Sequence, residues 1–181
     1  MRRAVFLDRD GVINRVPVRD DRPSSPASLA DFDLLPGVPG ALGELRRAGY
    51  LLIVVTNQPD VARGHASREA VEAIHAWLRA SLPLDDIRAC YHDDGDHCAC
   101  RKPAPGMLYA AAVERDIRLT DSYMVGDRWR DIAAGRQAGC TTILVPGPRE
   151  ATAVDPHVSA NDLCHAAAWI LSRSEARHAV D

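Results

Sequence analysis

The run Ala4-Val5-Phe6-Leu7-Asp8-Arg9-Asp10-Gly11 decides the fold. Its apolar part is typical of a buried parallel strand, and two aspartates one residue apart follow it directly. Ligands of open α/β sheets bind beyond the carboxyl ends of the strands, so Asp8 and Asp10 are placed where a ligand would bind. Both carboxylates could converge on one cation, and Mg²⁺ fits because it takes one or two carboxylates and bridges to phosphate. On this segment alone, a simple turn at the end of a strand is an equally good interpretation.

Strand patterns and helical patterns alternate along the rest of the chain. We expect further strands at 51–55, 87–91, 123–125, 141–145 and near Val158. Helices are expected after Pro36, from Ser67 to Leu82, from Pro105, up to Gly139 and over 161–171. This alternation predicts an α/β fold, a Rossmann-like three-layer sandwich with a mostly parallel central sheet. We interpret residues 1–181 as a single domain in which 16–33 form an irregular loop and the polar end, 172–181, is frayed.

The composition excludes several classes of protein. A net charge of −3 argues against nucleic acid as the main partner. No apolar run approaches the ~18 residues of a membrane span. The first three residues lead straight into the first strand without a cleavage pattern, so we expect a cytoplasmic protein. The sequence has no obvious heptad repeat or exposed apolar run, and we expect a monomer.

Polar residues also follow the later strands. Thr56 and Asn57 offer a hydroxyl and an amide that suit phosphate oxygens, Lys102 precedes an expected helix, and Asp127 ends another strand. Each of these residues alone has an ordinary structural explanation. Together, carboxylates, a lysine and a hydroxyl at one edge of a sheet indicate Mg²⁺-dependent phosphoryl transfer.

Four motifs carry a family resemblance. D-x-D-G-V at 8–12, T-N-Q at 56–58, R-K-P at 101–103 and G-D-R-x-x-D at 126–131 resemble, in this order, the motifs of the haloacid dehalogenase-like (HAD) phosphatases. The resemblance implies an HAD-like fold. The segments after the first two motifs are short, which leaves no room for a large cap domain.

The resemblance also implies a role for each motif residue. Asp8 would be the nucleophile and form an aspartyl-phosphate, and Asp10 would protonate the leaving alcohol and later activate water. Thr56 and Lys102 would hold the transferred group. Mg²⁺ would bind Asp8, Asp127 and the backbone carbonyl of Asp10, with Asp131 in a supporting role. Because Asp10 must carry a proton in one half-reaction, we expect the surrounding carboxylates to raise its pKa.

A cysteine cluster indicates a second metal site. Cys90-x-His92 and Cys98-x-Cys100 place four soft or borderline ligands in eleven residues, a composition that suits tetrahedral structural zinc. His97 is a competing ligand, and buried thiols without a metal are the alternative interpretation. We expect zinc to order loop 90–100, which has no core of its own and runs directly into Arg101 and Lys102. The remaining cysteines, Cys140 and Cys164, are expected only to pack.

The cysteine cluster narrows the resemblance to particular groups of HAD-like phosphatases. C-x-H…C-x-C-R-K-P, with T-N-Q-x-x-x-A-R-G upstream, is similar to D-glycero-D-manno-heptose 1,7-bisphosphate 7-phosphatases and to the related histidinol-phosphate phosphatases. This resemblance implies a phosphorylated sugar as substrate. The residues expected to contact it are Asn57, Arg63, Arg101 and Arg128.

One segment departs from the heptose enzymes. Residues 15–23 lack their His, Gly and aromatic pattern and add arginines, so the sugar stays open between a heptose 1,7-bisphosphate and an octose 1,8-bisphosphate. Arg19 or Arg22 could bind a distal phosphate, although a solvated loop face is as good an interpretation. A histidinol-phosphate phosphatase, a DNA 3′-phosphatase and a non-enzymatic module are the further alternatives.

Overall fold

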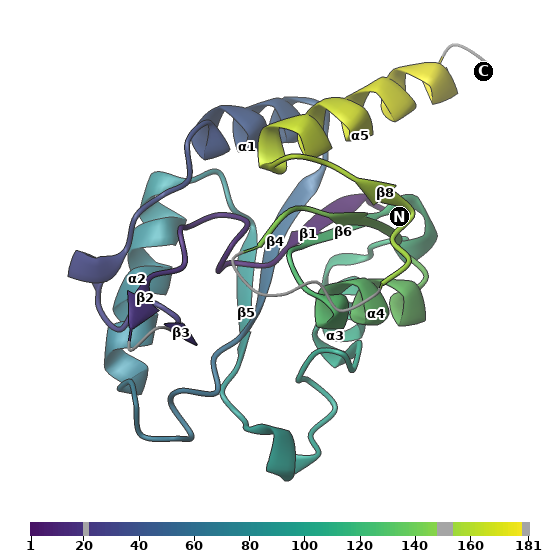
Figure 1. Cartoon of the computed structure of the whole chain (residues 1–181). Coiled ribbons are helices and arrows are strands. Elements are labelled where there is room, and N and C mark those ends of the chain that lie inside the picture. Colours follow the sequence, from purple (N-terminus) through teal and green to yellow (C-terminus); the bar gives the residue numbers. More distant parts are fainter. Residues whose placement is uncertain (20–21, 148–153, 179–181) are drawn as a thin grey trace.

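The computed structural model describes residues 1–19, 22–147 and 154–178 (Figure 1). For Arg19, Arg22 and 175–178 it describes the backbone alone. Within this part of the chain, six strands form one sheet in the order β5-β4-β1-β6-β7-β8, and every neighbouring pair is parallel. The strands are β1 (Ala4–Leu7), β4 (Leu51–Asn57), β5 (Asp86–Cys90), β6 (Tyr123–Gly126), β7 (Thr141–Leu144) and β8 (Val158–Ser159).

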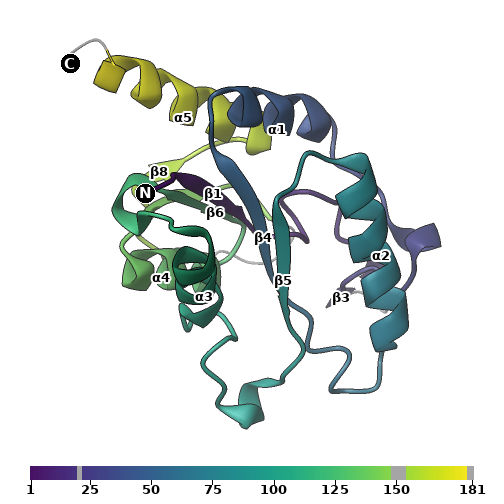
Figure 2. The ribbon, with the colours of Figure 1, turned by 180° about the vertical axis from the view of Figure 1, so that it is seen from behind.

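Helices cover both faces of the sheet. They are α1 (Val38–Arg47), α2 (Arg68–Ser81), α3 (Gly106–Arg115), α4 (Trp129–Ala138) and α5 (Leu163–His178). Buried residues of α1, α2 and α5 share one apolar core, and α1 and α5 lie side by side in Figure 1. Helices α3 and α4 supply the second core on the opposite face, as Figure 2 shows from behind. The three-layer α/β architecture is therefore confirmed.

Strand β1 joins the two cores. Val5 and Leu7 pack into the core under α1 and α5, whereas Ala4 and Phe6 pack into the core under α3 and α4. All four side chains are fully buried, because successive side chains of a strand point to opposite faces and here both faces are covered. Burial of each large apolar side chain contributes roughly 1.5–3 kcal/mol. This central position fixes where the chain leaves the sheet at Asp8.

Two expectations about irregular segments are wrong. Loop 16–33 contains a short antiparallel hairpin, β2 (Val18–Arg19) with β3 (Arg22–Pro23), followed by a 3₁₀ turn, η1 (Leu29–Asp31). The hairpin closes where the Ser24 N–H donates to the carbonyl of Pro17, at 2.9 Å. Helix α5 continues past Leu171 to His178, so the expected fraying is wrong for 172–178, and residues 179–181 lie outside the described part of the chain. The buried Ser174 accepts a hydrogen bond from Arg3. Polar composition alone did not reveal this contact.

The segments that could carry a large cap are short. The hairpin and η1 lie between β1 and α1, and residues 58–67 between β4 and α2 form turns. In the described residues, these two segments form no further elements beyond this hairpin, η1 and these turns. No helix in the described ranges is long and apolar enough to cross a membrane.

Candidate active site

The carboxyl ends of β1, β4 and β6 meet at one edge of the sheet. Leu7 pairs with Val54 on one side and with Val125 on the other, so the residues that follow these strands lie together. They open into a pocket of about 1290 Å³. Of the residues predicted from the sequence, the pocket is lined by Asp8, Asp10, Thr56, Asn57, Arg63, Arg101, Lys102, Asp127 and Arg128.

Lys102 is buried against Asp8. Its Nζ lies 2.8 Å from Asp8 Oδ1, 2.6 Å from Asp131 Oδ1 and 2.7 Å from the carbonyl oxygen of Val55. Burial alone would lower the pKa of Lys102, but Asp131 and Asp8 raise it, so the ammonium group stays charged. A fixed cation therefore stands beside the carboxylate expected to be the nucleophile.

Asp127 has two buried oxygens without a hydrogen-bond partner among the described residues. A Cβ at either Gly11 or Gly147 would collide with this carboxylate, so the two glycines allow the backbone to approach it closely. Ligand oxygens of Asp8, Asp127 and Asp131 lie within 4.8 Å of one another. An unpartnered carboxylate in such a cluster fits a hard cation such as Mg²⁺, which accepts carboxylate oxygens and keeps several waters.

Asp131 supports the site from the first turn of α4. One of its oxygens contacts Lys102, and the other accepts the backbone N–H of Arg128 at 3.0 Å. The second contact caps the N-terminus of α4. Asp131 therefore links the N-terminus of α4 to the ammonium group of Lys102.

Asp10 is held in a dense hydrogen-bond network. Arg9 donates to both of its oxygens at 3.0 Å, Asn14 donates to Oδ1, and Ser25 and Gln58 donate to Oδ2. Burial alone would raise the pKa of Asp10, but the Arg9 guanidinium and these donors hold it well below its usual range. The expected raised pKa is wrong for this state, because Asp10 faces cationic and neutral donors more closely than carboxylates.

Residues of the T-N-Q segment line the pocket and contact the backbone of Lys102. Thr56 is buried, and its Oγ1 accepts a hydrogen bond from Gln58 at 2.9 Å. The Asn57 amide donates to the carbonyl of Lys102 and accepts its N–H, at 2.9 and 3.0 Å. Asn57 thus holds the backbone of Lys102, and it also lines the pocket.

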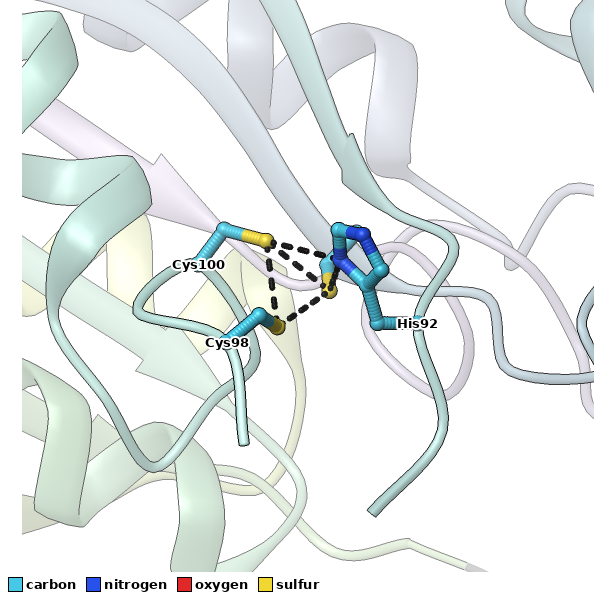
Figure 3. A group of neighbouring side chains, drawn as sticks. His92, Cys98 and Cys100 are labelled. Atoms are coloured by element: carbon cyan, nitrogen blue, oxygen red, sulfur yellow. Dashed lines mark hydrogen bonds between the residues drawn. The ribbon is translucent and has the colours of Figure 1, made fainter. Parts of the chain in front are cut away.

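The four predicted ligands Cys90, His92, Cys98 and Cys100 converge at the end of β5. Figure 3 shows His92, Cys98 and Cys100 pointing toward one another. The five closest pairs among the three sulfurs and His92 Nδ1 are 3.1–3.6 Å apart. Tetrahedral ligands ~2.0–2.3 Å from a common zinc ion would lie roughly 3.3–3.8 Å apart. The donor set and spacing therefore fit a zinc-type site that includes His92.

The loop that carries this cluster also holds two arginines of the pocket. Arg63 makes a two-pronged ion pair with Asp93, at 2.9 and 2.5 Å. Arg101 donates to Asp94 at 2.8 Å and to the carbonyl of His92 at 3.1 Å. The zinc-type loop therefore positions Arg101 directly, one residue before Lys102.

The other two predicted arginines have different outcomes. Arg128 lines the pocket, with its Nε 3.7 Å from Asp127 Oδ1 and without a hydrogen bond. The side chain of Arg19 lies outside the described residues. Arg130, which sequence reasoning missed, lines the pocket and donates to Asp94 at 2.8 Å.

Comparison with known proteins identifies the family. Residues 99–166 match the HAD-hydrolase-like family model. The chain is 38% identical to the D-glycero-β-D-manno-heptose 1,7-bisphosphate 7-phosphatase of Haemophilus ducreyi, over 84% of this chain and 87% of that protein. It is 40% identical to the enzyme of the same name from Vibrio cholerae, over 78% and 80% of the two chains. This chain belongs to the HAD-like phosphatase family.

The HAD-like phosphatase also resembles solved structures over nearly its whole length. A crystal structure of D,D-heptose 1,7-bisphosphate phosphatase from B. bronchiseptica, complexed with magnesium and phosphate, matches with a TM-score of 0.81 and 32% identity. The match covers 94% of this chain and 99% of that one. The enzyme from Burkholderia thailandensis matches with a TM-score of 0.67 and 27% identity, covering 94% and 99%.

Sequence reasoning missed the residues that surround Asp10 in this HAD-like phosphatase. Arg9 carried one usable signal: a strand alternates its faces, so an arginine between two pocket aspartates points into the fold and needs buried partners. Gln58 lay inside a quoted motif without an assigned role. Asn14 and Ser25 had no such signal, because their contacts depend on how loop 11–28 folds back.

Magnesium should stabilise this phosphatase more at pH 8 than at pH 5.5. Burial and neighbouring carboxylates raise the pKa of Asp127 to about 8, and burial above all raises that of Asp8 to about 6. Both pKa values exceed those of the same carboxyls in the unfolded chain, so the metal-free fold retains protons that the unfolded chain releases. The stability of the metal-free fold therefore falls as the pH rises through this window. Mg²⁺ at Asp8 and Asp127 would have to displace these protons, so its binding should be weaker at low pH.

The measurement is the melting temperature with and without Mg²⁺ at the two pH values. The Asp127→Asn variant is the control, and Mg²⁺ should raise its melting temperature much less. An equal or larger Mg²⁺ effect at pH 5.5 in the unmodified protein would contradict this account of the carboxylates.

Proposed function

We propose that this HAD-like phosphatase is a Mg²⁺-dependent enzyme that removes the terminal phosphate of a sugar bisphosphate through an aspartyl-phosphate at Asp8. D-glycero-D-manno-heptose 1,7-bisphosphate is the first candidate substrate, and an octose 1,8-bisphosphate is a related one. The observation that carries the proposal is the buried contact of Asp8 with Lys102, beside an Asp127 whose oxygens accept no hydrogen bond, in a pocket that is also lined by arginines.

The proposed first half-reaction moves the terminal phosphoryl group from the sugar to Asp8. An oxygen of Asp8 attacks phosphorus, the bond from phosphorus to the sugar oxygen breaks, and the departing oxygen takes a proton from Asp10. Lys102 and Thr56 hold the phosphoryl oxygens. Mg²⁺, held by Asp8, Asp127 and the backbone carbonyl of Asp10, would offset the repulsion between the carboxylate and the phosphate.

The second half-reaction returns the enzyme to its starting state. A water loses its proton to the Asp10 carboxylate and attacks phosphorus, the bond between Asp8 and phosphorus breaks, and phosphate leaves. The proton that Asp10 takes from this water replaces the one that it gave to the sugar oxygen. Before substrate binds, the low pKa of Asp10 keeps its carboxylate ionised, and the charge of an arriving phosphate raises this pKa, so that Asp10 takes up its proton as substrate binds.

The preference for a second phosphate rests on the arginines. Arg63, Arg101 and Arg130 gather at Asp93 and Asp94, on the same side of the pocket as the zinc-type loop. A guanidinium group binds phosphate through two parallel hydrogen bonds, and these groups are already held in place. We propose that the zinc-type loop, 90–100, binds a structural Zn²⁺ ion. We also propose that Arg101, Arg63 and Arg128 recognise the distal end of the sugar.

The proposal extends to the oligomeric state, the partners and the cellular compartment of the enzyme. We infer a single catalytic domain that acts as a monomer on a small phosphorylated sugar, without nucleic acid or membrane as partner. The three cysteine thiols of the zinc-type site are free to bind metal in this structure. A reducing compartment such as the cytoplasm preserves thiols of this kind.

A substrate panel tests the proposal. Phosphate release with Mg²⁺ should be fastest, by kcat/KM, from the heptose 1,7-bisphosphate or the octose 1,8-bisphosphate, and much slower from histidinol phosphate and from a 3′-phosphorylated oligonucleotide. The Arg101→Gln variant should lose mainly kcat/KM for the bisphosphate and little for p-nitrophenyl phosphate, which has no distal phosphate. Fastest turnover of histidinol phosphate or of the oligonucleotide would overturn the proposed substrate class.

A further inference from the structure

Arg9 and His75 form a buried pair behind Asp10, and neither takes part in the proposed half-reactions. Both side chains are almost completely inaccessible to solvent, at 0% and 1% exposure. Arg9 Nη1 lies 3.1 Å from His75 Nε2, and the Nε and Nη2 groups of Arg9 donate hydrogen bonds to the two oxygens of Asp10. The guanidinium thus joins helix α2 to the pocket.

The chemistry of the pair fixes the direction of this hydrogen bond. A guanidinium group can only donate, so Nε2 of His75 is the acceptor and the proton of the neutral imidazole is on Nδ1. The nearest carboxylate to Nδ1 is Glu72, whose Oε2 lies 3.8 Å away. Burial and the neighbouring Arg9 lower the pKa of His75 to about 4, in agreement with a neutral ring.

The pair holds Asp10 from the side opposite the substrate. Asp10 and Ser25 line the pocket, whereas Arg9 and His75 do not. The other end of Arg9 is also fixed, because its carbonyl accepts the backbone N–H groups of the turn that follows Asp10. Without an acceptor at position 75, one buried N–H of Arg9 would lack a hydrogen bond, and the guanidinium group could rotate away from Asp10.

We propose that His75 is a positioning residue for phosphoryl transfer, which orients Arg9 so that Arg9 holds the carboxyl of Asp10 toward the departing oxygen of the substrate. This inference rests on the proposed function, because it requires Asp10 to protonate the leaving group. Neither Arg9 nor His75 touches the substrate. Their effect depends on how much the leaving group needs a proton.

Two substrates with different leaving groups test the inference. The sugar oxygen of D-glycero-D-manno-heptose 1,7-bisphosphate needs a proton to depart, whereas the phenolate of p-nitrophenyl phosphate departs without one. The measured quantity is kcat/KM, which contains only binding and the first transfer. We expect His75→Leu to lower kcat/KM for the heptose substrate at least about tenfold more than for p-nitrophenyl phosphate, since general acid catalysis is worth about 10²–10⁴-fold.

Three further variants separate positioning from loss of structure. His75→Gln offers an amide oxygen as acceptor and should restore most of the lost selectivity for the heptose substrate. Arg9→Lys keeps the positive charge but loses the planar guanidinium group, and it should show the same selective loss as His75→Leu. This second variant keeps the test valid if His75→Leu does not fold. Leu78→Ala removes buried apolar volume from α2 and should lower the melting temperature with an unchanged ratio of the two kcat/KM values.

The outcomes distinguish this inference from the proposed function. Equal losses on both substrates in His75→Leu and Arg9→Lys, with an active unmodified enzyme, would overturn the inference alone. A gain on the heptose substrate would also overturn it, because it would mean that the pair restrains Asp10. An unmodified enzyme that releases phosphate from neither substrate would overturn the proposed function and this inference with it.

Discussion

The Asp8→Asn variant should lose phosphatase activity by about 10⁴-fold or more. An amide cannot serve as the nucleophile toward phosphorus, and removal of a covalent nucleophile is among the most damaging changes in an enzyme. The loss should appear in kcat for every substrate, p-nitrophenyl phosphate included, because the first chemical step is the same for all. Phosphate release by purified enzyme with Mg²⁺ measures it.

The fold should tolerate this change. Asparagine has nearly the shape of aspartate, and Lys102 retains its contact with Asp131. Burial raises the pKa of Asp8, which means that the metal-free fold disfavours its charge near neutral pH. The melting temperature without Mg²⁺ should therefore be unchanged or slightly higher. Activity within tenfold of the unmodified enzyme would rule out Asp8 as the nucleophile.

The Cys98→Ser variant should lose zinc from the cluster at the end of β5. A serine hydroxyl is a poor substitute for a thiolate, and even loss of a hydrogen bond to a ligand typically costs about 10–100-fold in metal affinity. Zinc per chain, measured by elemental analysis, should fall from about one to near zero. The matched control is Cys164→Ser, which removes a thiol outside the cluster and should leave the zinc content unchanged.

Loss of zinc should affect the substrates unequally. The backbone of Lys102 is held independently by Asn57, whereas Arg101 depends on Asp94 and the carbonyl of His92 in the loop. We expect kcat/KM for the sugar bisphosphate to fall by up to about 10²-fold, because a displacement of ~1 Å can cost this much. The fall for p-nitrophenyl phosphate should be smaller. An unchanged zinc content in Cys98→Ser would refute the ligand assignment.

Elements with a clear apolar run or a clear capping residue were predictable. Strand β1 has four consecutive apolar residues, and both its type and its central position follow from burial on two faces. Ser67 was recognisable as an N-cap, and its side chain accepts the N–H of Ala70. The β2–β3 hairpin was not predictable, because its strands are two residues long and their pattern carries no period.

The site was predictable where a residue lies at or just beyond the carboxyl end of a strand. Asp8, Thr56 and Asp127 reach one pocket because parallel strands end at one edge, and the sheet order places β1 between β4 and β6. The electrostatic state of Asp10 was not predictable. It depends on Arg9 and on three donors from segments up to 48 positions away in the sequence, and only the folded chain brings these together.

The central claim is that Asp8 carries the phosphoryl group during turnover. Acid quenching of the enzyme during steady turnover of a sugar bisphosphate, followed by peptide mass spectrometry, tests it most directly, because acid slows the hydrolysis of an acyl phosphate. The account predicts one phosphoryl group on the peptide that contains Asp8, located at Asp8 itself and absent from the Asp8→Asn variant. A phosphoryl group on Asp10 or any other residue, or retention of the label in Asp8→Asn, would contradict the account.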